Sequence, residues 1–199
     1  MRKIVCLVLS FILCAMMAGC NSESSSSSAP ASADHIKCEM KITDYGIIKM
    51  ELYPESAPIS VNNFVSLVKS GFYDGLKIHR VQPGFVIQGG NPSLAGKNET
   101  AAIKGEFSLN GVANTLAHTR GALSMARKGN DYNSATSQFF ICVADDRSSL
   151  DGKYAAFGYV TEGMDVVDKI VALCPGSGSM GMLSNPDTMP VIEYIKVIE

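Results

Sequence analysis

Residues 78–90 read Ile-His-Arg-Val-Gln-Pro-Gly-Phe-Val-Ile-Gln-Gly-Gly. This stretch places Arg80, Phe85 and Gln88 close together, on two short apolar segments that a Pro-Gly pair separates. β-branched and aromatic residues bounded by Pro and Gly are typical of short strands. A second apolar segment, Ser137-Gln-Phe-Phe-Ile141, follows later in the chain. Together the two segments offer a fixed cation, an apolar floor and amide groups.

Strand patterns extend on both sides of this stretch. Residues 36–43 alternate apolar and polar side chains, Asp44-Tyr-Gly46 is a turn, and Ile48, Met50 and Leu52 then share one face, which predicts a hairpin. Further strands are expected at about 76–81, 84–88, 121–126, 137–143, 155–160 and 190–198.

Two segments instead have helical spacing. Val61, Phe64, Val65 and Val68 form one apolar face, which predicts a helix from about Ser60 to Lys69 with Ser60 as its N-cap. A second helix is expected at about 164–172. Many short strands with few helices predict a mainly β fold, a closed eight-stranded antiparallel β-barrel capped by two α-helices.

The N-terminus has the pattern of a targeting segment. Arg2 and Lys3 precede an apolar stretch from Ile4 to Met17, which is shorter than the ~20 residues of a membrane span. Met17-Ala-Gly-Cys20 resembles a bacterial lipobox, in which cleavage precedes the cysteine and its thiol is lipidated. An ordinary secretory signal cut near Ala18 is the alternative.

This pattern predicts three parts of the chain: a lipoprotein signal peptide at 1–19, a lipidated Cys20 with a Ser-rich tether at 20–34, and a folded domain at 35–199. Several acyl chains on Cys20 would anchor the protein stably. The expected location is therefore the extracytoplasmic face of the cell membrane.

Composition and cysteines exclude several classes of function. The formal net charge of −2 gives no basic footprint for nucleic acid. No cofactor motif is present, and Cys38, Cys142 and Cys174 have no metal-ligand spacing. Cys142 lies in an apolar segment and is expected to be buried. A disulfide between Cys38 and Cys174 would need the two to lie close together, which the sequence does not show.

The cation, floor and amides together suit the rotation of a peptide bond that precedes proline. An amide resists rotation by roughly 18–20 kcal/mol because nitrogen shares its lone pair. A permanent cation such as Arg80 favours the twisted state if it meets that lone pair. Phe85 and Phe140 would bury the proline ring, and Gln88 and Gln138 would bind the substrate backbone. Taken singly, each could be a surface ion pair, plain core or an internal hydrogen bond.

Four motifs resemble those of the cyclophilin peptidyl-prolyl isomerases. They are Phe72-Tyr-Asp-Gly-Leu-Lys-Ile-His-Arg-Val-Gln-Pro-Gly-Phe-Val-Ile-Gln-Gly90, Gly121-Ala-Leu-Ser-Met-Ala-Arg127, Ser134-Ala-Thr-Ser-Gln-Phe-Phe-Ile141 and Leu150-Asp-Gly-Lys-Tyr-Ala-Ala-Phe-Gly158. The resemblance runs from about Ile36 to Glu199.

The resemblance implies an isomerase that needs no cofactor or metal and acts on proline-containing peptides and unfolded exported proteins. Arg80 matches the catalytic Arg. The positions that match substrate-binding residues are Phe85, Val86, Gln88, Ala126, Arg127, Gln138, Phe140, Leu150 and Tyr154.

Some positions depart from the family pattern. Val86 replaces the commoner Met, Tyr154 falls where many eukaryotic members have His, and Tyr132 falls where bacterial relatives often have Pro. Ser149 falls where some members have a Trp that contacts cyclosporin, so weak or reduced cyclosporin binding is expected. His79 and His118 are expected to be hydrogen-bonded framework residues, since the chemistry needs no acid or base.

Two other functions stay open at this point. The domain could hold proline-containing segments with little turnover, as a binding module. It could instead be a small-ligand-binding lipoprotein barrel, which requires an enclosed apolar lumen. The bulky inward residues Met50, Leu52, Phe139 and Ile141 are expected to fill that space.

Overall fold

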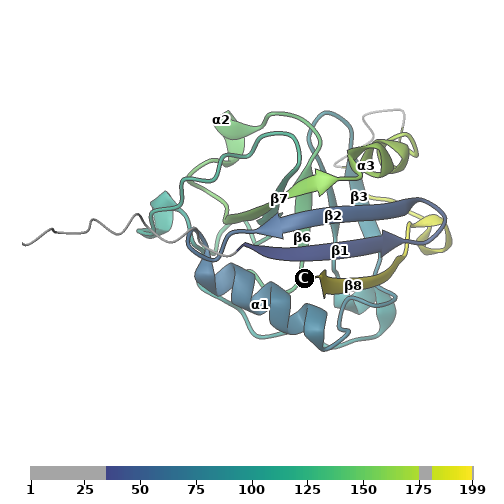
Figure 1. Ribbon diagram of the computed structural model, residues 1–199, viewed down its shortest axis with the longest axis horizontal. Helices are drawn as coiled ribbons and strands as arrows, with labels where there is room; N and C mark the ends of the chain where they lie inside the picture. Colours follow the sequence, from purple (N-terminus) through teal and green to yellow (C-terminus); the bar gives the residue numbers. More distant parts are fainter. Residues whose placement is uncertain (1–34, 175–180, 199) are drawn as a thin grey trace, which may run out of the picture. The chain divides into compact units, whose positions relative to one another are not determined.

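A computed structural model describes residues 35–174 and 181–198. In these residues, eight antiparallel strands form one sheet in the order β3-β4-β6-β5-β7-β2-β1-β8. Figure 1 shows β7, β2, β1 and β8 side by side in that order. The fold is therefore mainly β, as predicted. The strands are β1 Ile36–Ile42, β2 Gly46–Leu52, β3 Ile78–Gln82, β4 Val86–Gly89, β5 Ala122–Met125, β6 Phe139–Cys142, β7 Ala156–Glu162 and β8 Ile192–Ile198.

The sheet is curled, and its two edges meet without a continuous ladder. Between β3 and β8, an isolated bridge pairs Lys77 with Val191. The Ile78 amide donates to the Pro190 carbonyl over 2.9 Å. Pro190 has no N–H to return that bond, which limits the pairing at this seam. The prediction of a closed barrel is corrected to a curled sheet with a bridged seam.

Within the described part of the chain, three α-helices accompany the sheet: α1 Pro58–Lys69, α2 Arg147–Leu150 and α3 Met164–Val171. Figure 1 shows α1 beside β8 and α3 at the opposite side of the β1–β2–β8 strands. Both predicted helices are present, while the single-turn helix α2 was not predicted. Its four residues are too few to show helical periodicity in a sequence.

The start of α1 differs from the prediction. Ala57 is the N-cap, Pro58 occupies the first turn, and Ser60 lies inside the helix. The cap comes from Glu106, whose carboxylate accepts hydrogen bonds from the Ile59 amide (2.9 Å), the Ser60 amide (2.7 Å) and the Ser60 hydroxyl (2.7 Å). The prediction of Ser60 as N-cap was therefore wrong. A carboxylate that is distant in the sequence supplies the acceptor for these amides.

The interior is filled by side chains. Met50, Leu52, Phe139 and Ile141 are all buried in one hydrophobic core, as predicted. Phe64 of α1 packs on this core with its ring centroid 5.6 Å from that of Phe139. A small-ligand barrel would need an open lumen where these side chains lie, so this packing argues against that function.

The three cysteines in the described part of the chain are free thiols. The Cys38–Cys174 disulfide that the sequence left open is therefore not formed in this structure. Cys38 and Cys142 are buried, as expected for Cys142, and burial raises the pKa of each thiol to about 12.

The predicted signal peptide, Cys20 and the tether lie outside the described residues. Of the helices in 35–174 and 181–198, none is both long and apolar enough to cross a membrane.

Candidate active site

A pocket of about 90 Å³ gathers most of the predicted site residues. Nine of the ten side chains expected to catalyse or bind line this pocket, which places segments far apart in the sequence around one hollow. The lining residues are Arg80, Phe85, Val86, Gln88, Ala126, Arg127, Phe140, Leu150 and Tyr154.

Strand register brings these residues together. Gln88 of β4 lies opposite Arg80 of β3 on one side and opposite Phe140 of β6 on the other. Val86 is two residues before Gln88, so both side chains leave the same face of β4. Val86, Phe140 and the α2 residue Leu150 share a small buried cluster, separate from the main core. The pocket therefore rests on three adjacent strands.

Arg80 is half-buried and lines this pocket. Its guanidinium carbon lies 5.6 Å from the centre of the Phe85 ring. Nη1 donates to Oε1 of Gln88 over 3.3 Å, and Nη2 donates to Oε1 of Gln82. Burial lowers the pKa of Arg80, with Tyr154 opposing the shift, but a guanidinium stays protonated at any working pH.

The floor of the pocket is apolar. Phe140 is 4% exposed and meets the Tyr154 ring edge-on, with the centroids 5.8 Å apart. Val86 and Leu150, both buried, complete the floor. Such a surface can take a proline ring out of water, which favours its binding by the hydrophobic effect.

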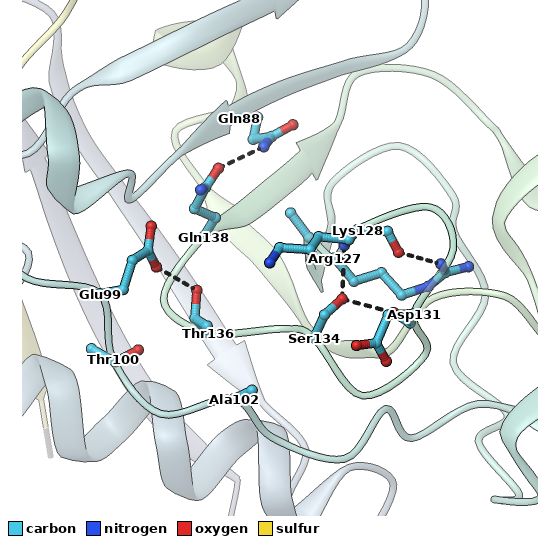
Figure 2. Close-up of a pocket in the computed structure, with 11 residues that line it drawn as sticks. Gln88, Glu99, Thr100, Ala102, Arg127, Lys128, Asp131, Ser134, Thr136 and Gln138 are labelled. Carbon is cyan, nitrogen blue, oxygen red and sulfur yellow. Dashed lines mark hydrogen bonds between the residues drawn. The ribbon is translucent and has the colours of Figure 1, made fainter.

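A second pocket of about 470 Å³ adjoins the first and shares Gln88, Ala126 and Arg127 with it. Gln138, the tenth predicted residue, lines this second pocket. Figure 2 shows the side chains of Gln88 and Gln138 meeting, where Nε2 of Gln88 donates to Oε1 of Gln138 over 3.0 Å.

The other residues that line the second pocket were not predicted as site residues. Figure 2 shows two loop segments facing each other across it. These segments belong to long polar loops, 89–105 and 127–136, of a length that is often associated with function. The additional lining residues are Glu99, Thr100, Ala102, Lys128, Asp131, Ser134 and Thr136.

Arg127 is held by contacts within the protein. Its guanidinium carbon lies 4.5 Å from the ring centre of Tyr154, 4.9 Å from that of Tyr132 and 5.4 Å from that of Phe107. The same group donates to the carbonyls of Lys153, Lys128 and Gly129. The side chain therefore ties the 127–136 loop to the wall that carries Tyr154, and a direct contact with substrate stays a prediction.

Residues 37–195 match the family described as cyclophilin type peptidyl-prolyl cis-trans isomerase/CLD. The chain belongs to this family. Its enzymatic class is that of the peptidyl-prolyl cis-trans isomerases.

Named relatives agree. This chain is 51% identical over 159 residues to a peptidyl-prolyl cis-trans isomerase of Acinetobacter baylyi. The match covers 77% of this chain and 80% of the relative. The chain is 42% identical over 164 residues to peptidyl-prolyl cis-trans isomerase A of Dickeya dadantii, across 79% of this chain and 82% of the relative.

Solved structures show the same fold. A crystal structure of a Cryptosporidium parvum cyclophilin type isomerase superposes with a TM-score of 0.70 at 29% identity, covering 83% of this chain and 98% of that one. Another crystal structure of that protein, in the presence of the dipeptide Ala-Pro, gives a TM-score of 0.69 at 28% identity, with coverage of 82% and 99%.

The two histidines that the sequence predicted to be framework residues, His79 and His118, are buried and line neither pocket. Nδ1 of His79 is buried without a hydrogen-bond partner, so the hydrogen-bonded role expected for His79 is not seen at this atom. Nε2 of His118 contacts the Ser124 hydroxyl at 3.0 Å, and its Nδ1 contacts the Asp151 carboxylate at 2.8 Å. His118 also stacks against Phe140 from behind, with the centroids 6.0 Å apart. The framework role predicted for His118 is confirmed. In 35–174 and 181–198, no cluster of His, Cys, Asp or Glu could hold a metal ion.

Acid should destabilise this cyclophilin through these histidines. Burial lowers the pKa of both His79 and His118, and the bond to Asp151 only partly opposes the shift for His118. Near pH 6 the unfolded chain therefore binds more protons than the folded one. The stabilisation is complete above the unfolded pKa of about 6.5 and is lost as pH falls towards the lower folded values.

We expect the free energy of unfolding, measured with urea, to fall between pH 7.5 and pH 5.5. His118→Gln keeps a neutral hydrogen-bonding side chain and should flatten part of that slope. An unchanged slope in the variant would show that His118 is not responsible.

Proposed function

We propose that this cyclophilin accelerates cis/trans exchange at X-Pro bonds in exported proteins and so assists their folding. Arg80 is the catalytic residue in this proposal, and the other pocket residues bind proline and its flanking backbone. The observation that carries it is the Arg80 guanidinium, held beside the Phe85 ring in a pocket that Phe140 also lines.

The chemistry follows from what Arg80 meets during rotation. In the planar ground state the prolyl nitrogen has no free lone pair, while in the twisted state the nitrogen becomes basic and accepts a hydrogen bond. A hydrogen bond to a charged group contributes roughly 1.5–3 kcal/mol, which is about one or two factors of ten in rate. The remainder must come from fixing both ends of the peptide and from excluding water.

The amide groups beside the pocket suit that second task. Gln88 and Gln138 are hydrogen-bonded to each other, and Gln88 lines both pockets. A substrate that lies along the wall that the two pockets share can place its proline ring over Phe140. The substrate residues before proline then extend towards the larger pocket. The substrate backbone then exchanges hydrogen bonds with these amides, and this fixes the peptide on one side of the rotating bond.

For the location we propose lipid anchoring through Cys20 at the extracytoplasmic face of the cell membrane. Support comes from the sequence alone: a basic start, a short apolar stretch, Met17-Ala-Gly-Cys20 and a Ser-rich tether. The site needs no nucleotide, which suits a compartment without ATP. Cys20→Ser should move the protein from the membrane fraction to the soluble fraction.

The folding role is tested by refolding an exported protein whose slow phase is limited by a native cis-proline. The full-length cyclophilin, solubilised in detergent, should shorten that phase at catalytic concentrations. A proline-segment binding module would instead need stoichiometric amounts or would slow refolding. A slow phase that does not respond would contradict the proposed role.

Cyclosporin should bind weakly. Ser149 lies exposed on α2, one residue before the pocket residue Leu150, and its hydroxyl donates to the Asp146 carbonyl. A serine offers neither an aromatic wall nor an indole N–H there. We therefore expect an inhibition constant well above the nanomolar range and tighter binding by Ser149→Trp. Nanomolar inhibition of the wild type would contradict this expectation.

A further inference from the structure

Gln82 lies beside Arg80 and was not singled out in the sequence. The two residues are two positions apart on β3, so their side chains leave the same face of the strand. Nη2 of Arg80 donates to Oε1 of Gln82. Gln82 is absent from the lining of both pockets described above, whereas Arg80 lines the smaller one.

Gln82 and Gln88 hold the guanidinium from two sides. Gln88 accepts from Nη1 over 3.3 Å, and Gln82 accepts from Nη2. Because a guanidinium is rigid and planar, acceptors on two of its nitrogens fix the direction of the plane as well as its position. The Arg80 plane is thereby aligned next to Phe85, with its carbon 5.6 Å from the ring centre.

We propose that Gln82 is a positioning residue for Arg80. It acts through the guanidinium and does not touch substrate. This inference rests on the proposed catalytic role of Arg80. A neutral amide oxygen suits the task, because it directs the guanidinium without forming an ion pair with it.

The backbone under Gln82 is held by a segment from the C-terminal part of the chain. Met182 forms a bridge with Arg80, and the Leu183 amide donates to the His79 carbonyl over 2.9 Å. Gly181 lies so close that a Cβ there would be 2.5 Å from the Val81 carbonyl oxygen and 2.9 Å from Cβ of Gln82. This contact limits movement of the β3 backbone at Gln82.

The test is a double-mutant cycle on the full-length protein in detergent, with a proline-containing tetrapeptide as substrate. Gln82→Met keeps the length of the side chain and removes the acceptor. We expect it to lower kcat/KM by roughly three- to tenfold, mostly through kcat, since a hydrogen bond to a partly exposed charged group is lost. In the Arg80→Ala background the same change should have almost no effect.

One further variant separates position from charge, and another serves as a control. Gln82→Glu keeps an acceptor but pairs the cation, so kcat/KM should fall while protection of the guanidinium protons from exchange persists. Thr161→Met, at an exposed position of β7, serves as the matched control and should leave kcat/KM unchanged.

Equal losses from Gln82→Met with and without Arg80 would overturn the inference, because they would show a merely structural effect. An unchanged kcat/KM in Gln82→Met would overturn it as well. If Arg80→Ala itself retained full activity, the proposed role of Arg80 would fail instead, so the two failures are distinguishable.

Discussion

Arg80→Ala is expected to lower kcat/KM for a proline-containing tetrapeptide by about ten- to hundredfold, since one hydrogen bond to a charged group contributes roughly 1.5–3 kcal/mol. Binding of the peptide should change much less, because the apolar floor with Phe140, Val86 and Leu150 is intact. The loss should therefore fall mainly on kcat, as expected for an interaction made only in the transition state. Coupled isomerase assays and peptide titrations measure the two quantities separately.

Two variants control this result. Arg80→Lys keeps the charge but not the planar fork, so its activity should lie between those of wild type and Arg80→Ala. Arg147→Ala removes an exposed arginine of α2 that pairs with Asp145 and lines neither pocket, and it should retain full activity. Equal turnover by wild type and Arg80→Ala, with both binding peptide, would favour the binding module.

The fold was largely predictable because its signals are local. Alternation in 36–43 and in 48–52 fixes which side chains enter the core, and those strands form as β1 and β2. The seam between β3 and β8 depends instead on how segments more than 100 residues apart meet. Local patterns contain no such information, so the sequence indicated a barrel but not its incomplete closure.

The site was predictable for a different reason. Nine predicted residues line one pocket because the resemblance supplied positions that no local pattern could connect, as with Phe140 and Leu150. The contacts of Arg127 with three rings and the bond from Arg80 to Gln82 were missed. Both depend on side chains that meet in space, and in the sequence each residue resembles an ordinary surface position.

Glu106→Ala is expected to be the most destabilising substitution considered for this protein. The Glu106 side chain is 1% exposed and accepts hydrogen bonds from the amides of Ile59 and Ser60 and from the Ser60 hydroxyl. Removing the carboxylate leaves these donors of α1 without their acceptor in a site that water hardly reaches. The expected loss in the free energy of unfolding is roughly 2–4 kcal/mol, from the lost cap and the unsatisfied donors.

Glu106→Gln tests the role of the charge. It keeps one acceptor oxygen but loses the negative charge at the N-terminus of α1, so it should cost less than the alanine variant. Glu193→Ala is the matched control, because Glu193 is an exposed carboxylate that pairs with Lys41 and should contribute under about 1 kcal/mol. Urea unfolding measures all three. A loss in Glu106→Ala no larger than in Glu193→Ala would mean that water or backbone rearrangement satisfies the donors of α1 without the carboxylate.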